Sequence, residues 1–444
     1  MDKSLDSARN FKIQWFAVNQ LLKVLPMNSC DQPGLLPLEA ALQRINAVVN
    51  CAQNCEYVPL LNARGRVLAE DIIASRPIPD FDNSAMDGYA FASNSVGRTD
   101  TFRVAGIALA GQPYLGALSE NECIRIMTGA KMPSGCDCVA MQENTLRDGD
   151  ALTLLKVPAK GENVRLAGHD LPQGSRILLR GRRLGPVDIG MLASLGELQV
   201  PVYTKPRVGV FSTGDELTPL GQPLEPGRIY DSNRYLLLSA LAEYPIEVID
   251  FGSIPDDRQK LEQVFLEAAS QCHAVISSGG VSVGDADYTR ELLVTLGQVD
   301  FYKLAIKPGK PFAFGTLHTA GDSTPCYFFG LPGNPVSAAV TFEQLALPAL
   351  EKLTGANPQA KLVLKLRACS SFKKRPGRTD FQRGRILANQ NGIIGVESIN
   401  SQSSGALSTM VVANAYVRLE QERGNVEEGE YVDVLPFDTS LPLL

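Results

Sequence analysis

The chain has 444 residues, more than one hydrophobic core usually supports, which predicts several domains. Hydrophobic residues make up 44% of it and charged residues 20%, values typical of a soluble globular protein. The formal net charge is −6, which argues against nucleic-acid binding, because that binding needs a basic face to neutralise phosphates. A local basic pocket for a small anion is compatible with this charge.

No segment predicts a membrane span. The longest uncharged apolar stretch, 327–342, is interrupted by Pro-Gly-Asn-Pro and is shorter than the ~20 residues that a span needs. Charged side chains interrupt the first positions, so these do not predict a signal peptide. The cysteines lack zinc-finger spacing and are interpreted as free thiols of a cytoplasmic protein. Residues 1–34 are interpreted as an N-terminal extension, with Met27 as an alternative to Met1 as the start.

The first part of the chain predicts a mixed helical and β domain. Residues 37–50 have the apolar spacing of a helix, and 58–75 combine a short strand with a turn. Residues 165–205, after the long insert at 82–164, have a similar mixture of helical and strand patterns. We therefore expect 35–81 and 165–205 to form one linking domain.

The insert at 82–164 predicts a β-rich domain, because short apolar segments alternate there with Gly and Pro at turn spacing. After it, residues 185–196 predict a compact helix. Pro186 suits the first turn of that helix, and Gly196 suits its C-terminal cap.

Strand and helix patterns alternate from 206 to 357, which predicts a doubly wound parallel α/β sheet. The expected strands begin at 207, 245, 273 and 326, and the expected helices at 231, 257, 288 and 335. Beyond this domain, apolar residues alternate with period two at 361–368 and 430–437. We therefore expect 358–444 to form a C-terminal antiparallel, barrel-like β domain in an elongated molecule.

The predicted carboxyl ends of the parallel strands carry glycines and acids, and ligands of such sheets bind outside these ends. Glycine-rich backbone and helix N-termini attract anions, whereas carboxylates repel phosphate. Both fit one site if a divalent cation lies between them. The residues concerned are Glu216, Asp256, Gly279, Gly280, Asp287, Pro332 and Pro335.

Each of these residues alone has a simpler interpretation. Asp256, Asp257 and Asp287 precede predicted helices, where Asp is a favoured N-cap. Asn334 followed by Pro335 is typical of an N-cap and a first turn. The glycine pair is compatible with a tight turn. The conjunction of acids at three successive strand ends favours a ligand site.

Two basic segments, 303–315 and 372–384, follow the strand ends in sequence. A solvated face is the simpler interpretation of such a run. The alternative is an oxyanion pocket, because Lys and Arg match tetrahedral anions. The cations are Lys303, Lys307, Lys310, Arg378 and Arg383.

The loop at 82–90, DNSAMDGYA, has neither helical nor strand periodicity and carries two carboxylates. Asp82 and Asn83 are expected to hold the loop by turn hydrogen bonds. Asp87 is either a functional acid or the centre of a local Asx-turn.

Six motifs resemble, in this order, the molybdopterin molybdenumtransferases (the MoeA family). They are DNSAMDGYA, STGDEL, SSGGVSVGDADY, KPGKPFAFG, GLPGNPVSA and PGRTDFQRG. The chain is also similar to the C-terminal domain of gephyrin. The resemblance extends from about residue 35 to the end.

The resemblance implies the insertion of molybdenum into molybdopterin. Adenylylated molybdopterin and molybdate would give molybdenum-molybdopterin and AMP, with a divalent cation, usually Mg²⁺. It also implies an elongated homodimer of four-domain chains, with the active cleft at the dimer interface. The adenylyltransferase that supplies the substrate is an expected partner, whereas nucleic acid and membranes are not.

The resemblance also assigns residues by their positions in the motifs. The catalytic positions are Asp87, Glu216, Asp256, Asp287, Thr128 and Asp170, and the four acids Asp87, Glu216, Asp256 and Asp287 would hold the metal. The substrate and oxyanion positions are Lys303, Lys307, Arg383, Ser404, Gly279, Gly280, Pro332 and Pro335. Asp87 is expected to cross the dimer cleft. At Ser404 the chain departs from the family, which often has Gly where this chain has Ser403.

Two other functions are compatible with parts of the chain. A molybdopterin adenylyltransferase shares only the α/β domain, and the insert and flanking domains disfavour it. A non-catalytic scaffold of the gephyrin type is the alternative from another class. Partner binding without molybdate-dependent turnover would identify the scaffold.

Overall fold

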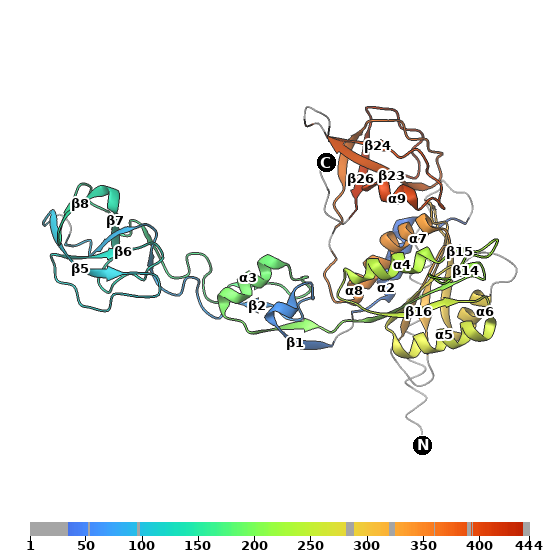
Figure 1. Cartoon of the computed structure of the whole chain (residues 1–444), viewed down its shortest axis with the longest axis horizontal. Helices are drawn as coiled ribbons and strands as arrows, with labels where there is room; N and C mark the ends of the chain where they lie inside the picture. Colours follow the sequence, from blue (N-terminus) through green and yellow to red (C-terminus); the bar gives the residue numbers. More distant parts are fainter. Residues whose placement is uncertain are drawn as a thin grey trace, which may run out of the picture.

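The computed structural model describes residues 34–51, 54–95, 98–280, 288–318, 325–358, 360–388, 392 and 394–437. Three six-stranded sheets carry the fold, together with several two-stranded ones. Figure 1 shows them in an elongated arrangement. One sheet lies at the far left, a small mixed part lies in the middle, and the other two sheets lie together on the right. The chain is multidomain, with mixed α/β sheets and a C-terminal barrel, as the sequence predicts.

The middle part joins segments that are far apart in sequence. Strand β1 (Cys55–Pro59) pairs antiparallel with β12 (Gln199–Tyr203), and β2 (Ile72–Ile73) pairs with β11 (Arg176–Leu178). A 3-10 turn, Leu60–Ala63, follows β1. Helix α3 (Pro186–Leu195) has Pro186 in its first turn and Gly196, with φ 83°, as its left-handed cap. The predicted boundaries of this helix are confirmed.

The insert forms one sheet in the order β7-β4-β6-β5-β9-β8. Strand β4 lies between β6 and β7, so all four of its residues are buried. The prediction of a β-rich insert is confirmed. The strands of this sheet are β4 (Gly88–Phe91), β5 (Thr101–Ala108), β6 (Glu122–Ile126), β7 (Cys138–Met141), β8 (Thr145–Asp148) and β9 (Ala151–Leu154), with a 3-10 turn at Gln142–Asn144. Strands β3 (Asn83–Ser84) and β10 (Val164–Arg165) pair with each other in a separate two-stranded sheet.

The α/β sheet has the order β16-β13-β17-β21-β20-β18. Its first four strands are parallel, as predicted: β16 (Glu247–Ile254), β13 (Arg207–Thr213), β17 (Ala274–Ser278) and β21 (Cys326–Leu331). The last two, β20 (Pro311–Leu317) and β18 (Gly297–Lys303), form an antiparallel hairpin at the edge. Sequence reasoning assigned no strands there, because it took this stretch for a basic turn.

Helices cover both faces of this sheet (Figure 1). One face buries α5 (Arg258–Gln271) and α6 (Tyr288–Leu296). The other face buries α2 (Leu38–Val48), α4 (Ser232–Ala242), α7 (Pro335–Thr341) and α8 (Leu347–Leu353), with a π turn at Phe342–Ala346 between the last two. Helix α2 joins this core through Leu38, Ala41 and Ile45, although its residues were expected in the linking domain.

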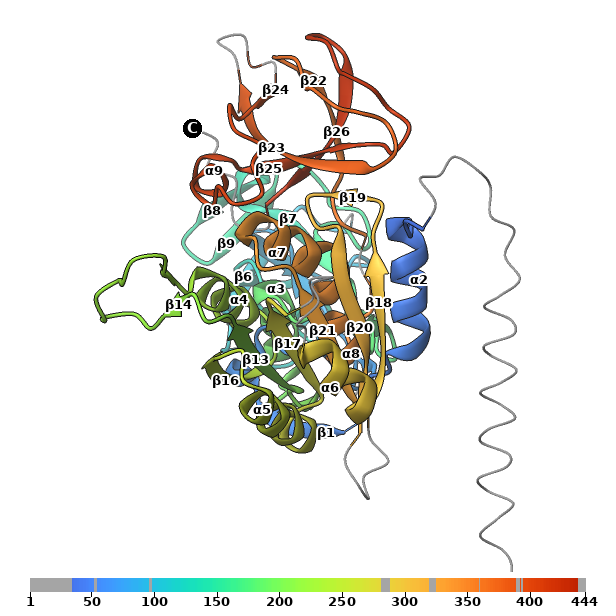
Figure 2. The same ribbon diagram turned by 90° about the vertical axis from the view of Figure 1, so that its right-hand side faces the viewer.

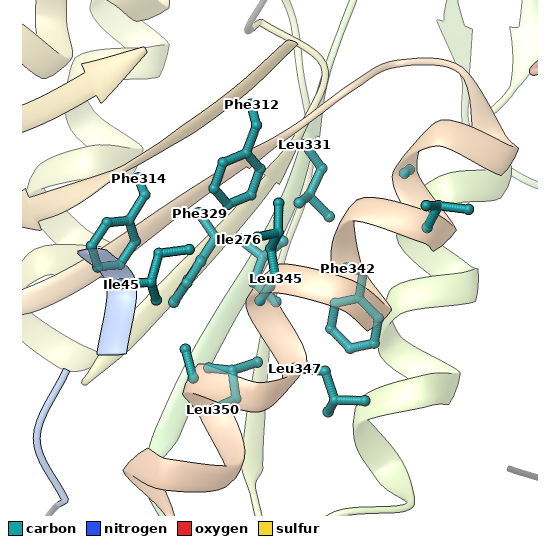
Figure 3. Close-up of a cluster of buried hydrophobic side chains, with 14 of the residues drawn as sticks. Ile45, Ile276, Phe312, Phe314, Phe329, Leu331, Phe342, Leu345, Leu347 and Leu350 are labelled. Atoms are coloured by element: carbon teal, nitrogen blue, oxygen red, sulfur yellow. The ribbon is translucent and has the colours of Figure 1, made fainter. Parts of the chain in front are cut away.

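The larger core is aromatic and aliphatic throughout (Figure 3). Phe312 and Phe314 of the edge hairpin meet Phe329 of β21, and the rings of Phe314 and Phe329 lie 5.2 Å apart. Burial of each such side chain contributes roughly 1.5–3 kcal/mol. The antiparallel edge is therefore part of the core rather than an appendage.

The C-terminal sheet closes into a barrel, because β23 (Thr379–Ala388) pairs with both β24 (Ile394–Ser398) and β25 (Ala415–Leu419). The remaining elements are β22 (Leu364–Ala368), β26 (Tyr431–Pro436) and the short helix α9 (Ser408–Val412). Strand β19 (Ile306–Lys307) leaves the α/β unit and pairs with β23. Figure 2 shows the barrel beyond α7, with β19 at the junction.

Two aspartates cap helices at the edge of the α/β sheet: Asp257, a cap that the sequence predicts, and Asp231, where a helix was expected to begin. Asp231 accepts a hydrogen bond from the backbone N–H of Arg234 (3.2 Å), and Asp257 accepts one from Lys260 (3.0 Å). Asp231 is 2% exposed, whereas Asp257 lies in solvent.

No helix in the described ranges is long and apolar enough to cross a membrane.

Because Asp231 is buried and Asp257 is exposed, removal of the two caps is expected to destabilise the fold by different amounts. Asp231→Ala is expected to lower the free energy of unfolding by about 3–5 kcal/mol, because it removes the buried one of the two carboxylates that pair with the buried Arg234. Asp257→Ala is expected to cost only about 1 kcal/mol, the value of an exposed cap. Hydrogen exchange of peptides from β13, α4 and α5 measures both effects locally. Equal costs would contradict the structural role of Asp231.

Candidate functional site

The strand-end site consists of the residues at the carboxyl ends of β16, β13, β17 and β21. Gly279 and Gly280 adopt φ values of +92° and +66°, in the left-handed region. A Cβ atom at Gly279 would lie 2.5 Å from the Thr213 carbonyl oxygen, and one at Gly280 would lie 2.6 Å from Thr289 Oγ1. Both positions therefore require glycine, and the turn brings backbone close to β13.

The acids of this site divide between capping and binding. Asp257 is the cap of α5, which leaves the neighbouring Asp256 available for another partner. Asp256 Oδ1 accepts a hydrogen bond from Thr213 Oγ1 at 2.5 Å. The carboxylate of Glu216 lies against the backbone of Gly214, and both acids are exposed. The capping interpretation thus applies to Asp257, while Asp256 is oriented by the end of β13.

Asn233, in the first turn of α4, connects the other strand ends. Its Nδ2 donates to Ser278 Oγ (2.8 Å) and to the Gly333 carbonyl oxygen (2.7 Å). Asn233 therefore ties α4, β17 and the Pro332–Pro335 turn together. Its Oδ1 is buried and, in the part of the chain that the structure describes, has no hydrogen-bond partner.

Asp231 holds α4 in place through a buried network. Its carboxylate accepts hydrogen bonds from Ser212 Oγ of β13 and from Arg234 Nε (2.9 Å). Arg234 Nη1 also donates to Asp250 Oδ2 of β16 at 2.6 Å. Burial acts to lower the pKa of Arg234, but its hydrogen bonds to the two carboxylates outweigh burial and raise that pKa. The start of α4 is thereby joined to two strands.

Pro332, Pro335, Arg383 and Ser404 lie on connected segments. Pro335 begins α7, as predicted, although the Asn334 side chain makes no capping hydrogen bond. The backbone N–H of Val336 donates to the Ser404 carbonyl oxygen (3.0 Å), which joins α7 to the barrel.

Arg383 is almost fully buried and supports the segment that carries Ser404. Its Nη2 donates to the carbonyl oxygens of Ser401 (3.2 Å) and Ser403 (2.9 Å), and its Nε donates to Thr409 Oγ1 (3.1 Å). Burial lowers its pKa below the ordinary value. These contacts give Arg383 a positioning role toward the loop at 401–404.

Lys303 and Lys307 lie on the edge hairpin and on β19, and both are exposed. Lys307 Nζ lies 3.3 Å from Asp380 Oδ2, across the β19–β23 pairing. Lys307 faces a cavity of about 790 Å³ at the junction of the α/β unit and the C-terminal barrel. We call it the basic cavity. Six cations line the basic cavity: Lys307, Lys310, Lys373, Lys374, Arg375 and Arg378.

Asp87 and Thr128 meet in the insert, far along the chain from the strand-end site (Figure 1). Asp87 Oδ1 accepts hydrogen bonds from the backbone N–H (2.7 Å) and the hydroxyl (2.8 Å) of Thr128. These two hydrogen bonds, the backbone one first, hold the pKa of Asp87 below its usual value. Because Thr128 is 41 positions away, the contact is not a local Asx-turn.

The loop around Asp87 is held by long-range contacts rather than by the expected turn hydrogen bonds. Asp82 Oδ1 accepts a hydrogen bond from the backbone N–H of Ala167 (2.8 Å), 85 positions away, and Asn83 belongs to strand β3, which pairs with β10. Asp170 is exposed on the following turn, where its backbone N–H donates to Ile78 (3.0 Å). The 82–87 loop is thus fixed, while the Asp87 carboxylate stays at the surface.

The four predicted metal ligands are not gathered within one described chain. Asp87 belongs to the insert, Glu216 and Asp256 belong to the strand-end site, and Asp287 lies outside the described residues. Among the residues that the structure describes, no three His, Cys, Asp or Glu side chains group as metal ligands.

Known families match the chain along most of its length. Residues 36–196 match the MoeA N-terminal region (domain I and II), 209–352 a probable molybdopterin binding domain, and 365–437 the MoeA C-terminal region (domain IV). The chain is 44% identical to the molybdopterin molybdenumtransferase of Haemophilus influenzae over 91% of this chain and 99% of that protein.

The chain belongs to the molybdopterin molybdenumtransferase family. It is a transferase of molybdenum cofactor biosynthesis. It is also 32% identical to a gephyrin of Dictyostelium discoideum, over 90% of this chain and 62% of that protein. Its fold is similar to a crystal structure of a molybdopterin biosynthesis protein from Pyrococcus horikoshii, with TM-score 0.77, 29% identity, and coverage of 91% of this chain and 100% of that chain.

Sequence reasoning on this transferase missed Asn233 and three of the six cations of the basic cavity, Lys373, Lys374 and Arg375. The stretch DSN (231–233) at the start of α4 indicated only a helix start, and the contact of Asn233 with Gly333 spans 100 positions. The run at 373–378 signalled positive charge, but only the β19–β23 pairing places it beside Lys307.

The glycine turn of the transferase is testable with a matched pair. Gly279→Ala is expected to lower the free energy of unfolding by about 2 kcal/mol, because the left-handed φ and the Thr213 carbonyl oppose a Cβ atom. Gly333→Ala is expected to change it by less than about 0.5 kcal/mol, since no atom lies within 4 Å of the new Cβ. Thermal and urea unfolding measure the two. Equal stabilities would contradict the close approach at Gly279.

Proposed function

We propose that this transferase inserts molybdenum into molybdopterin, taking adenylylated molybdopterin and molybdate and releasing molybdenum-molybdopterin and AMP. The observation that carries the proposal is the strand-end site. There the left-handed Gly279-Gly280 backbone lies beside exposed acids and the Pro332–Pro335 turn. Glycine-rich backbone accepts a phosphate group closely, and acids support a cation beside it.

A divalent cation, Mg²⁺ in our proposal, fits these donors because carboxylate oxygens are its preferred ligands. Glu216 and Asp256 are exposed on neighbouring strand ends and would hold it, with Asp287 as a further predicted ligand. Bound there, it would neutralise charge that develops on the phosphate oxygens. Thr213 orients Asp256 for this role through its hydroxyl.

Asp87 is proposed to complete the site from a second subunit. Within one chain it belongs to a different sheet, at the other end of the molecule from the strand-end site (Figure 1). Its carboxylate is partly exposed and, held ionised by Thr128, is suited to contact a cation or the pterin. Asp170 is proposed to act nearby. A homodimer with its active cleft between subunits follows from this arrangement.

Molybdate is proposed to bind beside Lys303, Lys307 and Ser404, because cations and a hydroxyl match a tetrahedral dianion. Arg383 would act there chiefly by holding the loop of Ser404. Val336 joins that loop to α7, so the oxyanion pocket would border the nucleotide-side turn.

The cellular location of the enzyme and the supplier of its substrate are also proposed. Free thiols at Cys123, Cys138 and Cys326 support a cytoplasmic location, where thiols stay reduced. An adenylyltransferase is the proposed supplier of substrate. The domain division at 35–81 with 165–205, 82–164, 206–357 and 358–444 stays a prediction.

The test is AMP release from adenylylated molybdopterin by the purified chain, with and without molybdate and Mg²⁺. Release is expected to need both additions, and Asp87→Ala is expected to lower it about 100-fold. Asp148→Ala is the control, because Asp148 is an exposed acid of the same sheet. Full activity of Asp87→Ala would contradict the role of the loop. Absence of release under every condition would contradict the reaction and favour a scaffold.

A further inference from the structure

We propose that Arg125 is a positioning residue for Asp87. Together with Gln142 it forms a contact, which we call the arginine clamp, on the backbone that carries the Asp87 carboxylate. The use of the arginine clamp in catalysis rests on the proposed function, whereas the clamp itself does not. Neither of its residues belongs to the motif DNSAMDGYA, and the strand order β7-β4-β6 of the insert brings both to that motif.

Asp87 lies immediately before β4, between the ends of the two neighbouring strands. Thr128, which follows β6, donates two hydrogen bonds to the carboxylate. From the other side, the backbone N–H of Gln142, which follows β7, donates to the Asp87 carbonyl oxygen (3.1 Å). The carboxylate and the backbone of Asp87 are therefore held from different strands, so their relative position depends on what joins those strands.

The side chain of Arg125 joins the three strands at this point. In the antiparallel register of β4 and β6, Arg125 lies directly opposite Tyr89. Its Nη1 donates to the Gly88 carbonyl oxygen (3.1 Å), and its Nη2 donates to Gln142 Oε1 (2.6 Å). Arg125 thus extends from β6 across β4 to the residue that follows β7. One guanidinium connects all three strands beside Asp87.

The orientation of this guanidinium is fixed by an aromatic ring. Its central carbon lies 4.9 Å from the centroid of the Tyr89 ring, and Tyr89 is 5% exposed, so the ring is held by the core of the insert. A guanidinium is a planar fork of donors, whereas the ammonium of lysine is a point charge on a flexible stem. The bridge of two acceptors and a ring is therefore specific to arginine.

The acceptors of Arg125 are uncharged, a carbonyl and an amide oxygen. Arg103 of the neighbouring β5, by contrast, pairs with the carboxylate of Glu122. Because uncharged acceptors do not neutralise a guanidinium, its charge acts on the Asp87 carboxylate and adds to the hydrogen bonds of Thr128, which chiefly lower the pKa of Asp87. Among the described residues, no hydrogen bond joins Arg125 to Asp87 directly. The arginine clamp thus orients this carboxylate and leaves its oxygens to Thr128 and to a ligand.

The first test is the maximal rate of AMP release by Arg125→Met with molybdate and Mg²⁺. The rate is expected to fall at least about tenfold, because a small misplacement of a functional acid slows a reaction strongly. The molybdate concentration for half-maximal rate is expected to stay unchanged, and Arg125→Lys is expected to recover only part of the loss. Arg147→Met is the control, since it removes one exposed cation from β8, at the far edge of the same sheet. Wild-type activity of Arg125→Met would overturn the proposal.

A double-mutant cycle separates positioning from a general loss of structure. In a chain that already carries Asp87→Ala, Arg125→Met is expected to lower the rate no further, because a positioning residue acts only through its target. A further loss of about tenfold in that background would identify a merely structural role and overturn the proposal.

Hydrogen exchange of peptides that cover 84–91 tests the arginine clamp without reference to the reaction. Exchange is expected to be at least about tenfold faster in Arg125→Met and in Gln142→Leu than in the wild type, and unchanged in Arg147→Met. If Arg125→Met does not fold, Arg125→Lys and Gln142→Leu carry the same comparison. Equal exchange in all variants would overturn the clamp. If the clamp variants exchange faster but the wild type never releases AMP, the clamp stands and the proposed function fails. If the wild type releases AMP and the clamp variants neither exchange faster nor lose rate, the reverse holds.

Discussion

The buried carboxylate of Asp231 is the contact on which the strand-end site depends. It caps α4 and accepts a hydrogen bond from the hydroxyl of Ser212 on β13. It also pairs with Arg234, which donates a second hydrogen bond to Asp250 on β16. A buried carboxylate is tolerated because each of its oxygens has a donor. With α4 fixed, Asn233 can reach both β17 and the Gly333 turn. One ionic centre thereby sets the relative positions of three strand ends.

The second constraint is the junction between the α/β unit and the barrel. Strand β19 extends the barrel sheet by pairing with β23, and the Ser404 carbonyl binds the start of α7. Both contacts are backbone hydrogen bonds, so they hold geometry without depending on side-chain identity. The proposed oxyanion pocket and the basic cavity lie at this junction, which explains why cations from two units can serve one ligand.

Local features of the fold were predictable because they depend on neighbouring residues. The caps Asp231 and Asp257, and the ends of α3 at Pro186 and Gly196, follow from short-range preferences. The edge hairpin β18–β20 was not predicted, because KPGK dominated the interpretation of a stretch whose flanks pair with each other. A turn signal shows where the chain reverses but not which strands it joins.

The functional residues show the same contrast between features set by neighbouring residues and features set by distant ones. The motifs indicated Gly279, Gly280 and Asp256, whose partners lie at adjoining strand ends. Asn233 was missed because its partner, Gly333, is brought near only by the folded sheet. The sequence named both basic segments of the cavity, 303–315 and 372–384, but not the β19–β23 pairing that brings them together. Tertiary contacts between distant segments leave no periodic trace in a single sequence.

We propose that Asp87 and Glu216 act at one site although they lie beside separate sheets of the chain. The most direct measurement is AMP release by doubly tagged heterodimers that combine one Asp87→Ala chain with one Glu216→Ala chain. If the site lies between subunits, one of the two sites is intact, and about half of the wild-type activity is expected while each variant homodimer stays inactive. Inactive heterodimers, or a chain that forms no dimer, would contradict a site shared between subunits.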